Sequence, residues 1–407
     1  MEKYVCVLST DNYLEGVLVL NENLKALKSK YPLLCLINEN ISKETIRKLK
    51  LFHIDYKLIP SINFNCKTLY NWKYTFDKIN VFSLTEYDKV VYLDSDFLIL
   101  ENIDHLFKLS TPTMASDVPF HANIFNSAVM IIKPNLKDYN NLKKLIKKYE
   151  KKGITNIGDQ NILNDYFKNT GLLNPTYNAM CVIQKIINAK KGTKYPVYYS
   201  TKGINNPKII HYILSNKPFL VDKPYDDKYY NTYNNYLIKI REKLLKNTKL
   251  TIVINNINKD IKIKSIIKKI NKLNHPKIKV IYLSKEKKKI STNITTITTF
   301  KSFQRHLNNA DYVYVVDNNS YLNPNIIDYS MKLLLKHHLD WIQLYDNKYD
   351  FLILNKSIIN ESKIITNNIH DKIFKKEILL KYNNIEIIKN KSNKIGILKA
   401  TNMNCTP

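Results

Sequence analysis

The first sixty residues alternate between strand-like and helix-like patterns, and this alternation constrains the fold more than any other feature. Residues 4–8, 33–38 and 56–59 are apolar runs typical of buried strands. Between them, residues 14–27 carry apolar side chains near a 3.6-residue period, and residues 41–51 form a shorter amphipathic segment. This order predicts an α/β fold, with a parallel sheet covered by helices on both faces.

A later apolar run ends in two aspartates. Residues 89–93 are typical of a buried strand, Asp94 and Asp96 follow one residue apart, and apolar character resumes at Phe97. Carboxylates at the end of a buried strand are costly unless a positive charge lies between them. Because α/β sheets bind ligands outside the carboxyl ends of their strands, the pair predicts a divalent cation that holds a phosphorylated ligand. A solvated turn is the competing interpretation, since an isolated Asp-x-Asp is a weak signal.

Other polar residues interrupt apolar segments of the first half. Lys78 lies in a predicted helix over residues 72–87, and Asn126-Ser127 opens an apolar strand. Asp159 is suited to cap the helix that Gly158 opens, and His211 in an apolar strand is by default a core residue. The turn after the first strand has no G-x-G-x-x-G motif, which argues against a dinucleotide or P-loop site.

The net charge of +29 is unusual for a chain of 407 residues with 24% charged residues. Attraction to polyanions is one interpretation. Solvated lysine faces are the other, and we favour them because the lysine runs are scattered and lack interleaved arginine and aromatic residues. The five cysteines show no C-x-x-C spacing, and no apolar run approaches the ~20 residues of a membrane span. With a strand starting at the N-terminus, we expect a cytoplasmic protein.

The pattern starts again in the second half. A connector at residues 225–245 precedes predicted strands at 250–254, 279–283 and 311–316, the last ending at Asp317. We therefore expect two domains, 1–245 and 246–407, with Asp317-Asn318-Asn319 as a weaker echo of the first acidic pair. Further predicted elements of this half are a helix at 261–273, helices at 300–307, 325–338 and 370–382, and strands at 341–345 and 351–354.

The first half resembles the retaining glycosyltransferases of the glycogenin and galactinol synthase type, glycosyltransferase family 8. The matching segments occur in the family's order over residues 1–220: 8–13, 78–79, 92–96, 102–107, 125–127, 158–160, and His211 with 217–219. The resemblance implies a GT-A fold and transfer of a hexose (glucose, galactose or N-acetylglucosamine type) from a UDP-sugar to a glycan or protein acceptor. The second half resembles GT-A enzymes, of the inverting family 2 type, only loosely.

The resemblance also implies roles for individual residues. Asp94, Asp96 and His211 would bind Mn²⁺, with Mg²⁺ as the alternative. The donor nucleotide would contact Leu8, Thr10, Tyr13, Ser95, Lys78 and Lys217, and the transferred sugar would contact Asn126, Ser127, Asp159 and Gln160. Asp159, Gln160 and Lys78 are the candidate catalytic residues, and no nucleophile is assigned.

Three positions depart from the family pattern. Leu214 stands where the family commonly has glycine between the metal histidine and the phosphate lysine, and Ala128 and Asn161 also replace common glycines. Two alternatives remain open beside a transferase in the first half. One is a non-catalytic protein that binds polyanions or nucleic acid. The other is a bifunctional enzyme, for which the competing role of the second half is a scaffold or an acceptor-binding module. A homodimer is compatible with either.

Overall fold

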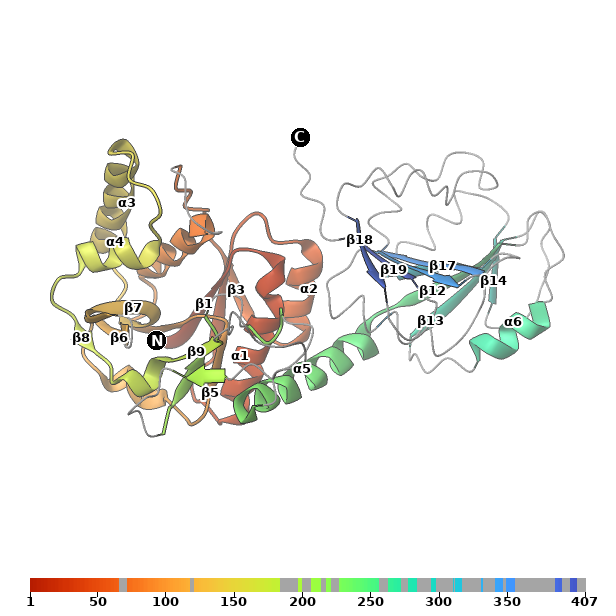
Figure 1. Ribbon diagram of the computed structural model, residues 1–407, viewed down its shortest axis with the longest axis horizontal. Helices are drawn as coiled ribbons and strands as arrows, with labels where there is room; N and C mark the ends of the chain where they lie inside the picture. Colours follow the sequence, from red (N-terminus) through yellow and green to blue (C-terminus); the bar gives the residue numbers. More distant parts are fainter. Residues whose placement is uncertain are drawn as a thin grey trace, which may run out of the picture. The chain divides into compact units, whose positions relative to one another are not determined.

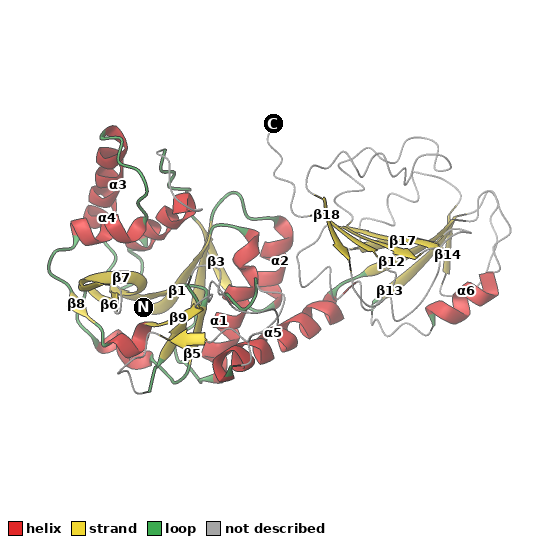
Figure 2. Ribbon diagram, viewed as in Figure 1, coloured by secondary structure: helices red, strands yellow, loops and turns green. Residues whose placement is uncertain are grey.

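The computed structural model (Figure 1) describes residues 1–65, 72–117, 121–183, 197–199, 206–213, 217–220, 227–255, 263–271, 277–283, 294–297, 310, 312–316, 331, 341–346, 349–355, 385–389 and 396–400. The chain forms two compact units, Met1–Ile240 and Arg241–Pro407. The first unit contains two sheets and the second unit contains one (Figure 2), and each unit is described separately.

The main sheet of the first unit has the order β3-β2-β1-β4-β7-β6-β8. The first four strands are parallel, and β7 pairs antiparallel with β4. The strands are β1 (Glu2–Leu8), β2 (Leu33–Ile37), β3 (Asp55–Leu58), β4 (Lys89–Leu93), β6 (Thr113–Asp117), β7 (His121–Ile132) and β8 (Gly171–Leu172). The predicted β-α-β-α-β start and its parallel sheet are confirmed.

Helical segments pack against this sheet and bury its apolar side chains. Val5 and Leu34 share one buried cluster with Phe76, Leu142 and Ile162, which come from segments packed on that face. The helical segments are η1 (Asp11–Tyr13), α1 (Leu14–Ala26), α2 (Lys43–Leu51), η2 (Trp72–Ser83), η3 (Asp104–Lys108), α3 (Leu136–Lys151), α4 (Asp159–Tyr166), η4 (Pro175–Asn178) and α5 (Lys228–Asn247). The predicted helix at 72–87 is thus a shorter 3₁₀ segment.

A second, smaller sheet brings distant parts of the first unit together. Its order is β10-β9-β11-β5, with β5 (Phe97–Ile99), β9 (Ala179–Ile183), β10 (Val197–Tyr199) and β11 (Ile209–His211). Strands β5 and β11 pair antiparallel, with His211 opposite Phe97. Because Phe97 directly follows Asp96, this register carries His211 to the acidic turn.

The sheet of the second unit has the order β14-β13-β12-β15-β17-β16-β19-β18. Its first four strands are parallel and β17 joins antiparallel, as β7 does in the first unit. The elements are β12 (Leu250–Asn255), α6 (Ile263–Ile270), β13 (Ile278–Leu283), β14 (Ile294–Ile297), β15 (Tyr312–Val316), β16 (Trp341–Asp346), β17 (Tyr349–Asn355), β18 (Ile385–Lys389) and β19 (Gly396–Ala400). Strands β14, β18 and β19 lie where the sequence predicted none.

Several predictions fall outside the described residues. These are Leu214, the acidic echo 317–319, and the helices at 300–307, 325–338 (apart from Met331) and 370–382. The predicted boundary at 245 lies within α5, and the division between the units falls slightly earlier in the same helix. Among the described helices, none combines the length and apolar character needed to cross a membrane.

Candidate active site

The acidic turn between β4 and β5 is held by a glycine of α1. An ideal Cβ on Gly16 would lie 2.5 Å from the Ser95 carbonyl oxygen and 3.0 Å from the Phe219 ring. Any side chain at this position would displace the turn, so Gly16 permits the close approach that places Asp94 and Asp96. Gly16 was not among the site residues predicted from the sequence. A glycine inside a predicted helix destabilises that helix, so its presence at this position could have indicated a close packing contact.

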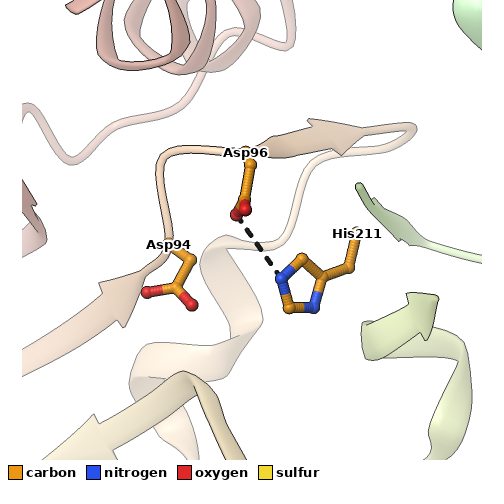
Figure 3. Close-up of side chains that lie close together, drawn as sticks. All are labelled: Asp94, Asp96 and His211. Carbon is orange, nitrogen blue, oxygen red and sulfur yellow. Dashed lines mark ion pairs between the residues drawn. The ribbon is translucent and has the colours of Figure 1, made fainter. Parts of the chain in front are cut away.

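Asp94, Asp96 and His211 converge on one point. One potential ligand atom from each lies within 4.8 Å of the others, and Figure 3 shows the three side chains pointing toward one another. His211 Nε2 lies 3.4 Å from Asp96 Oδ1, and the ring packs edge-on against Phe97 at 4.8 Å. The structure therefore brings together the three residues predicted to bind metal.

A lysine accompanies each aspartate. Lys217 Nζ lies 2.5 Å from Asp96 Oδ2 and donates to the Tyr212 carbonyl at 3.1 Å. Lys78 Nζ lies 3.1 Å from Asp94 Oδ1. Both ammonium groups are buried, so they offset the cost of burying carboxylates. The same groups could bind the oxygens of a diphosphate beside the aspartates.

Lys78 also joins the acidic turn to α4. Its Nζ lies 3.0 Å from Asp159 Oδ2 and 3.1 Å from Ser127 Oγ, and Ser127 Oγ donates to Asp159 Oδ2 at 2.6 Å. Asp159 was expected to suit the N-cap of α4, but the N-cap is Gly158, and Asp159 is the first helical residue. Its carboxylate is thus engaged by Lys78 and Ser127 rather than by the helix end.

The two aspartates differ in acidity because their neighbours differ. Burial raises the pKa of Asp94 above its usual value, although the charge of Lys78 opposes this. Burial also acts to raise the pKa of Asp96, but Lys217 and His211 outweigh it and hold that pKa below its usual range. In Lys78, burial would lower the pKa, yet Asp159 and Asp94 outweigh it and raise the pKa.

The donor set fits a divalent cation. Among the described residues, buried Asp96 Oδ1 has no hydrogen-bond partner, and the imidazole nitrogen Nε2 of His211 lies 3.4 Å from it. A buried carboxylate oxygen without a donor needs a positive partner. Two carboxylates with one imidazole suit a first-row divalent ion such as Mn²⁺ better than Ca²⁺, which prefers oxygen alone.

The other predicted site residues lie around this centre with different exposure. Tyr13 packs against Phe219 at 5.7 Å, and Lys217 Nζ lies 5.7 Å from the Tyr13 ring centre. Leu8 is 0% exposed, main chain included. The remaining predicted residues are Thr10 and Gln160, both half-buried, Ser95, which is buried, and Asn126, which donates to Asp117 Oδ1 at 2.8 Å.

Two buried polar residues that were not predicted from the sequence hold segments of the site in place. Asp77 accepts from Ser9 Oγ, Asn38 Nδ2 and the Ile62 amide at 2.7–2.8 Å, which fixes the loops after β1 and β2. Asn178 contacts His211 from η4. The one sequence feature that could have pointed to Asp77 is its position next to Lys78. No sequence feature pointed to Asn178, because its partners, Ser116 and His211, are distant in sequence.

Comparison with known proteins identifies the family of this chain. A family model, glycosyl transferase family 8, matches residues 4–222, more than half of the chain. "Glycogenin-1" of Caenorhabditis elegans is 31% identical over 224 residues, which cover 54% of this chain and 51% of that protein. "Uncharacterized protein R707" of Acanthamoeba polyphaga mimivirus is 29% identical over 281 residues, 60% of this chain and 96% of that protein.

Among solved structures, the glycosyltransferase GlyE of Streptococcus pneumoniae TIGR4 aligns with a TM-score of 0.42 and 19% identity, over 83% of this chain and 91% of that one. The chain spans about half the length of the nematode glycogenin that it matches. The family model nevertheless covers β1 to β11, including every residue of the acidic centre and both lysines. The chain therefore belongs to glycosyl transferase family 8.

Proposed function

We propose that this protein is a metal-dependent retaining glycosyltransferase that moves a hexose from a UDP-sugar to a glycan or protein acceptor. The observation that carries the proposal is the buried constellation of Asp94, Asp96 and His211 beside the ammonium groups of Lys78 and Lys217. A site for nucleic acid or other polyanions needs no such acids, so the constellation favours the transferase over that alternative.

The two carboxylates of one turn, each paired with a buried ammonium group from another segment, suit a diphosphate held through a cation. Asp94, Asp96 and His211 would hold Mn²⁺, which when bound supplies a Lewis acid for the departing diphosphate. Lys78 and Lys217 would bind the phosphate oxygens and stabilise the charge that develops as the sugar–phosphate bond breaks. Lys78 can do so because its ammonium group lies at the centre of the site, between Asp94 and Asp159.

Asp159 and Ser127 contact the same Lys78 ammonium group as Asp94, so a sugar attached to the diphosphate would lie within their reach. We assign Asn126, Ser127, Asp159 and Gln160 to that sugar, and Leu8, Thr10, Tyr13 and Ser95 to the nucleotide. The UDP donor is supported by relatives whose names specify it, among them "Putative UDP-glucuronate:xylan alpha-glucuronosyltransferase 5" of Arabidopsis thaliana, 30% identical over 227 residues.

We further propose that the second unit serves as an acceptor-binding module or a second transferase domain. Its sheet begins with the same strand order as the first, which supports a common architecture. The isolated first domain and the full chain would differ in acceptor use under either role. Binding of a nucleotide-sugar by the second half alone would favour the second transferase.

The test is release of UDP from a panel of UDP-sugars, UDP-glucuronate included, with and without Mn²⁺. Wild-type protein should release UDP from at least one donor in a metal-dependent way. Asp96→Asn should abolish release, whereas Asp88→Asn, which changes an exposed acid paired with the N-terminus, should not. A folded wild-type protein that neither turns over nor binds any donor would refute the proposal.

A further inference from the structure

Asn178 is a buried side chain that links the two sheets of the first unit at His211. It ends η4 directly before β9 and is 1% exposed. Its Nδ2 donates to the carbonyl oxygen of Ser116 in β6 at 3.0 Å, and its Oδ1 lies 2.8 Å from His211 Nδ1 in β11. One amide group therefore bridges the main sheet to the strand that carries the predicted metal-binding histidine.

The hydrogen bonds fix which way the amide faces. A carbonyl oxygen can only accept, so the Asn178 atom that faces Ser116 must be the NH₂ group. The Oδ1 atom then faces His211 Nδ1, and because Oδ1 can only accept, Nδ1 must carry a hydrogen. The reverse orientation would set two acceptors against each other at the buried Ser116 carbonyl, which is costly.

A hydrogen on Nδ1 leaves Nε2 as the nitrogen that can bind a cation, and Nε2 is the atom that faces Asp96. We propose that Asn178 is a positioning residue that holds the His211 ring in the orientation and tautomer that a divalent cation requires. The inference rests on the proposed metal-dependent function and deepens it. Such hydrogen bonds to metal-binding histidines commonly govern metal affinity by about 10- to 100-fold when they are removed.

The position of Asn178 in the fold supports a role beyond packing. The β5–β11 register places His211 beside the turn, and Phe97 supports one edge of the ring. Neither contact selects a ring nitrogen, since both act on carbon atoms or on the main chain. Among the described residues, Asn178 Oδ1 is the acceptor recorded for Nδ1. The hydrogen on Nδ1 therefore depends on this side chain, whereas Asp96 Oδ1 faces Nε2 and by itself would favour a hydrogen there.

The test compares Mn²⁺ binding, measured by EPR of free Mn²⁺ with and without UDP, in wild-type protein, Asn178→Ala and Asn178→Asp. The alanine variant should bind Mn²⁺ about 10- to 100-fold more weakly. The aspartate keeps an acceptor for Nδ1 but loses the donor to Ser116, so its affinity should stay within about threefold of wild type or exceed it. A purely structural role predicts instead that both variants lose Mn²⁺ affinity, because both lose the bond to Ser116.

Asn23→Ala is the matched control, because its buried amide also bonds a strand main chain, at Ile99. In the part of the chain that the structure describes, its hydrogen bonds reach Ile99 and Tyr236 and not the acids or His211. It should leave Mn²⁺ affinity unchanged. Equal Mn²⁺ binding by wild-type protein and folded Asn178→Ala would overturn the inference alone, whereas absence of Mn²⁺ binding by wild-type protein would overturn the proposed function.

If Asn178→Ala fails to fold, ¹⁵N NMR of metal-free wild-type protein tests which nitrogen of the His211 ring carries the hydrogen. The His211 signal, identified by its loss in His211→Gln, should show a hydrogen on Nδ1. A neutral ring with its hydrogen on Nε2 and a bare Nδ1 would overturn the inference.

Discussion

The ammonium group of Lys217 lies 2.5 Å from Asp96 Oδ2, on the carboxylate that is predicted to bind a cation. Both side chains are buried, so each charge depends on the other in the ligand-free protein. If Lys217 turns to a diphosphate when the donor binds, Asp96 is released toward the cation. The pair thus couples the two ligands: nucleotide binding and metal binding should each favour the other.

Removal of Lys217 should expose this coupling. Lys217→Met leaves a buried carboxylate without its cation, which typically costs about 3–5 kcal/mol of folding free energy. Mn²⁺ should therefore raise the melting temperature of the variant more than that of wild-type protein, while the affinity for UDP should fall. Calorimetry with and without Mn²⁺ measures the first effect, and UDP titration the second. Equal stabilisation of both proteins by Mn²⁺ would contradict the account.

Gly16→Ala tests the close contact between α1 and the acidic turn. Alanine in a helix is normally more stable than glycine by about 1 kcal/mol. Here the added Cβ would lie 2.5 Å from the Ser95 carbonyl oxygen, so we expect a loss of about 1–3 kcal/mol and weaker Mn²⁺ binding. Gly153→Ala is the control. It strains a backbone with φ of +63° but meets no atom within 4 Å, so it should lower stability without changing Mn²⁺ affinity.

Asp159→Asn should separate the sugar side of the site from the metal side. Asp159 bonds Lys78 and Ser127 and makes no recorded contact with Asp96 or His211. We expect transfer to fall by about 100-fold or more, as when a charged group that positions a reacting centre is removed, with Mn²⁺ affinity retained. Asp165→Asn changes an acid on the same helix that bonds Lys168 and Tyr149, and it should leave turnover intact. Full activity in Asp159→Asn would remove this residue from the mechanism.

Asp104 gives the first unit a stability that depends on pH. Burial would raise its pKa, but donors from the Lys30 amide, Ser29, Tyr4 and Asn102 outweigh it and lower the pKa. A lowered pKa means that the stabilisation is fully present above about pH 4, the unfolded value, and is lost as the pH falls through the lower folded value.

Asp104→Asn should therefore cost about 1–3 kcal/mol at pH 7, and the difference from wild type should shrink below about pH 4. Thermal unfolding at a series of pH values measures this. Asp55→Asn, at an exposed ion pair with Lys3, should show little effect at either pH. A deficit in Asp104→Asn that stays constant down to pH 3 would contradict the assigned hydrogen bonds.

Local sequence patterns sufficed to predict much of the fold. Apolar runs and helical periods identified β1, β2, β3 and β4, and the family resemblance and its α/β fold are confirmed for the first half. The predicted metal-binding residues could be named because the acids follow a buried strand and the resemblance singles out His211. The structure shows why they meet: Phe97 and His211 occupy one rung of the β5–β11 pair.

What the sequence could not provide depends on contacts between distant segments. Asn178 ends the short 3₁₀ helix η4, and its role appears only when β6 and β11 come together around it. The N-cap expectation for Asp159 was wrong because the helix begins one residue earlier: Gly158 has the extended N-cap backbone, and its amide donates to Asn161 Oδ1. Gly16 is one of only seven glycines in the chain and lies in a predicted helix. The need for glycine there follows only from the close approach of the Ser95 carbonyl oxygen, which the structure shows.

The most direct test of the central claim is calorimetric titration of UDP into wild-type protein and Asp96→Asn, each with Mn²⁺ and with a chelator. If Asp94, Asp96 and His211 hold a cation for the diphosphate, wild-type protein should bind UDP tightly only with Mn²⁺, and Asp96→Asn should lose that dependence. UDP binding of equal strength with and without Mn²⁺ in the wild-type protein, unaltered by Asp96→Asn, would contradict the account.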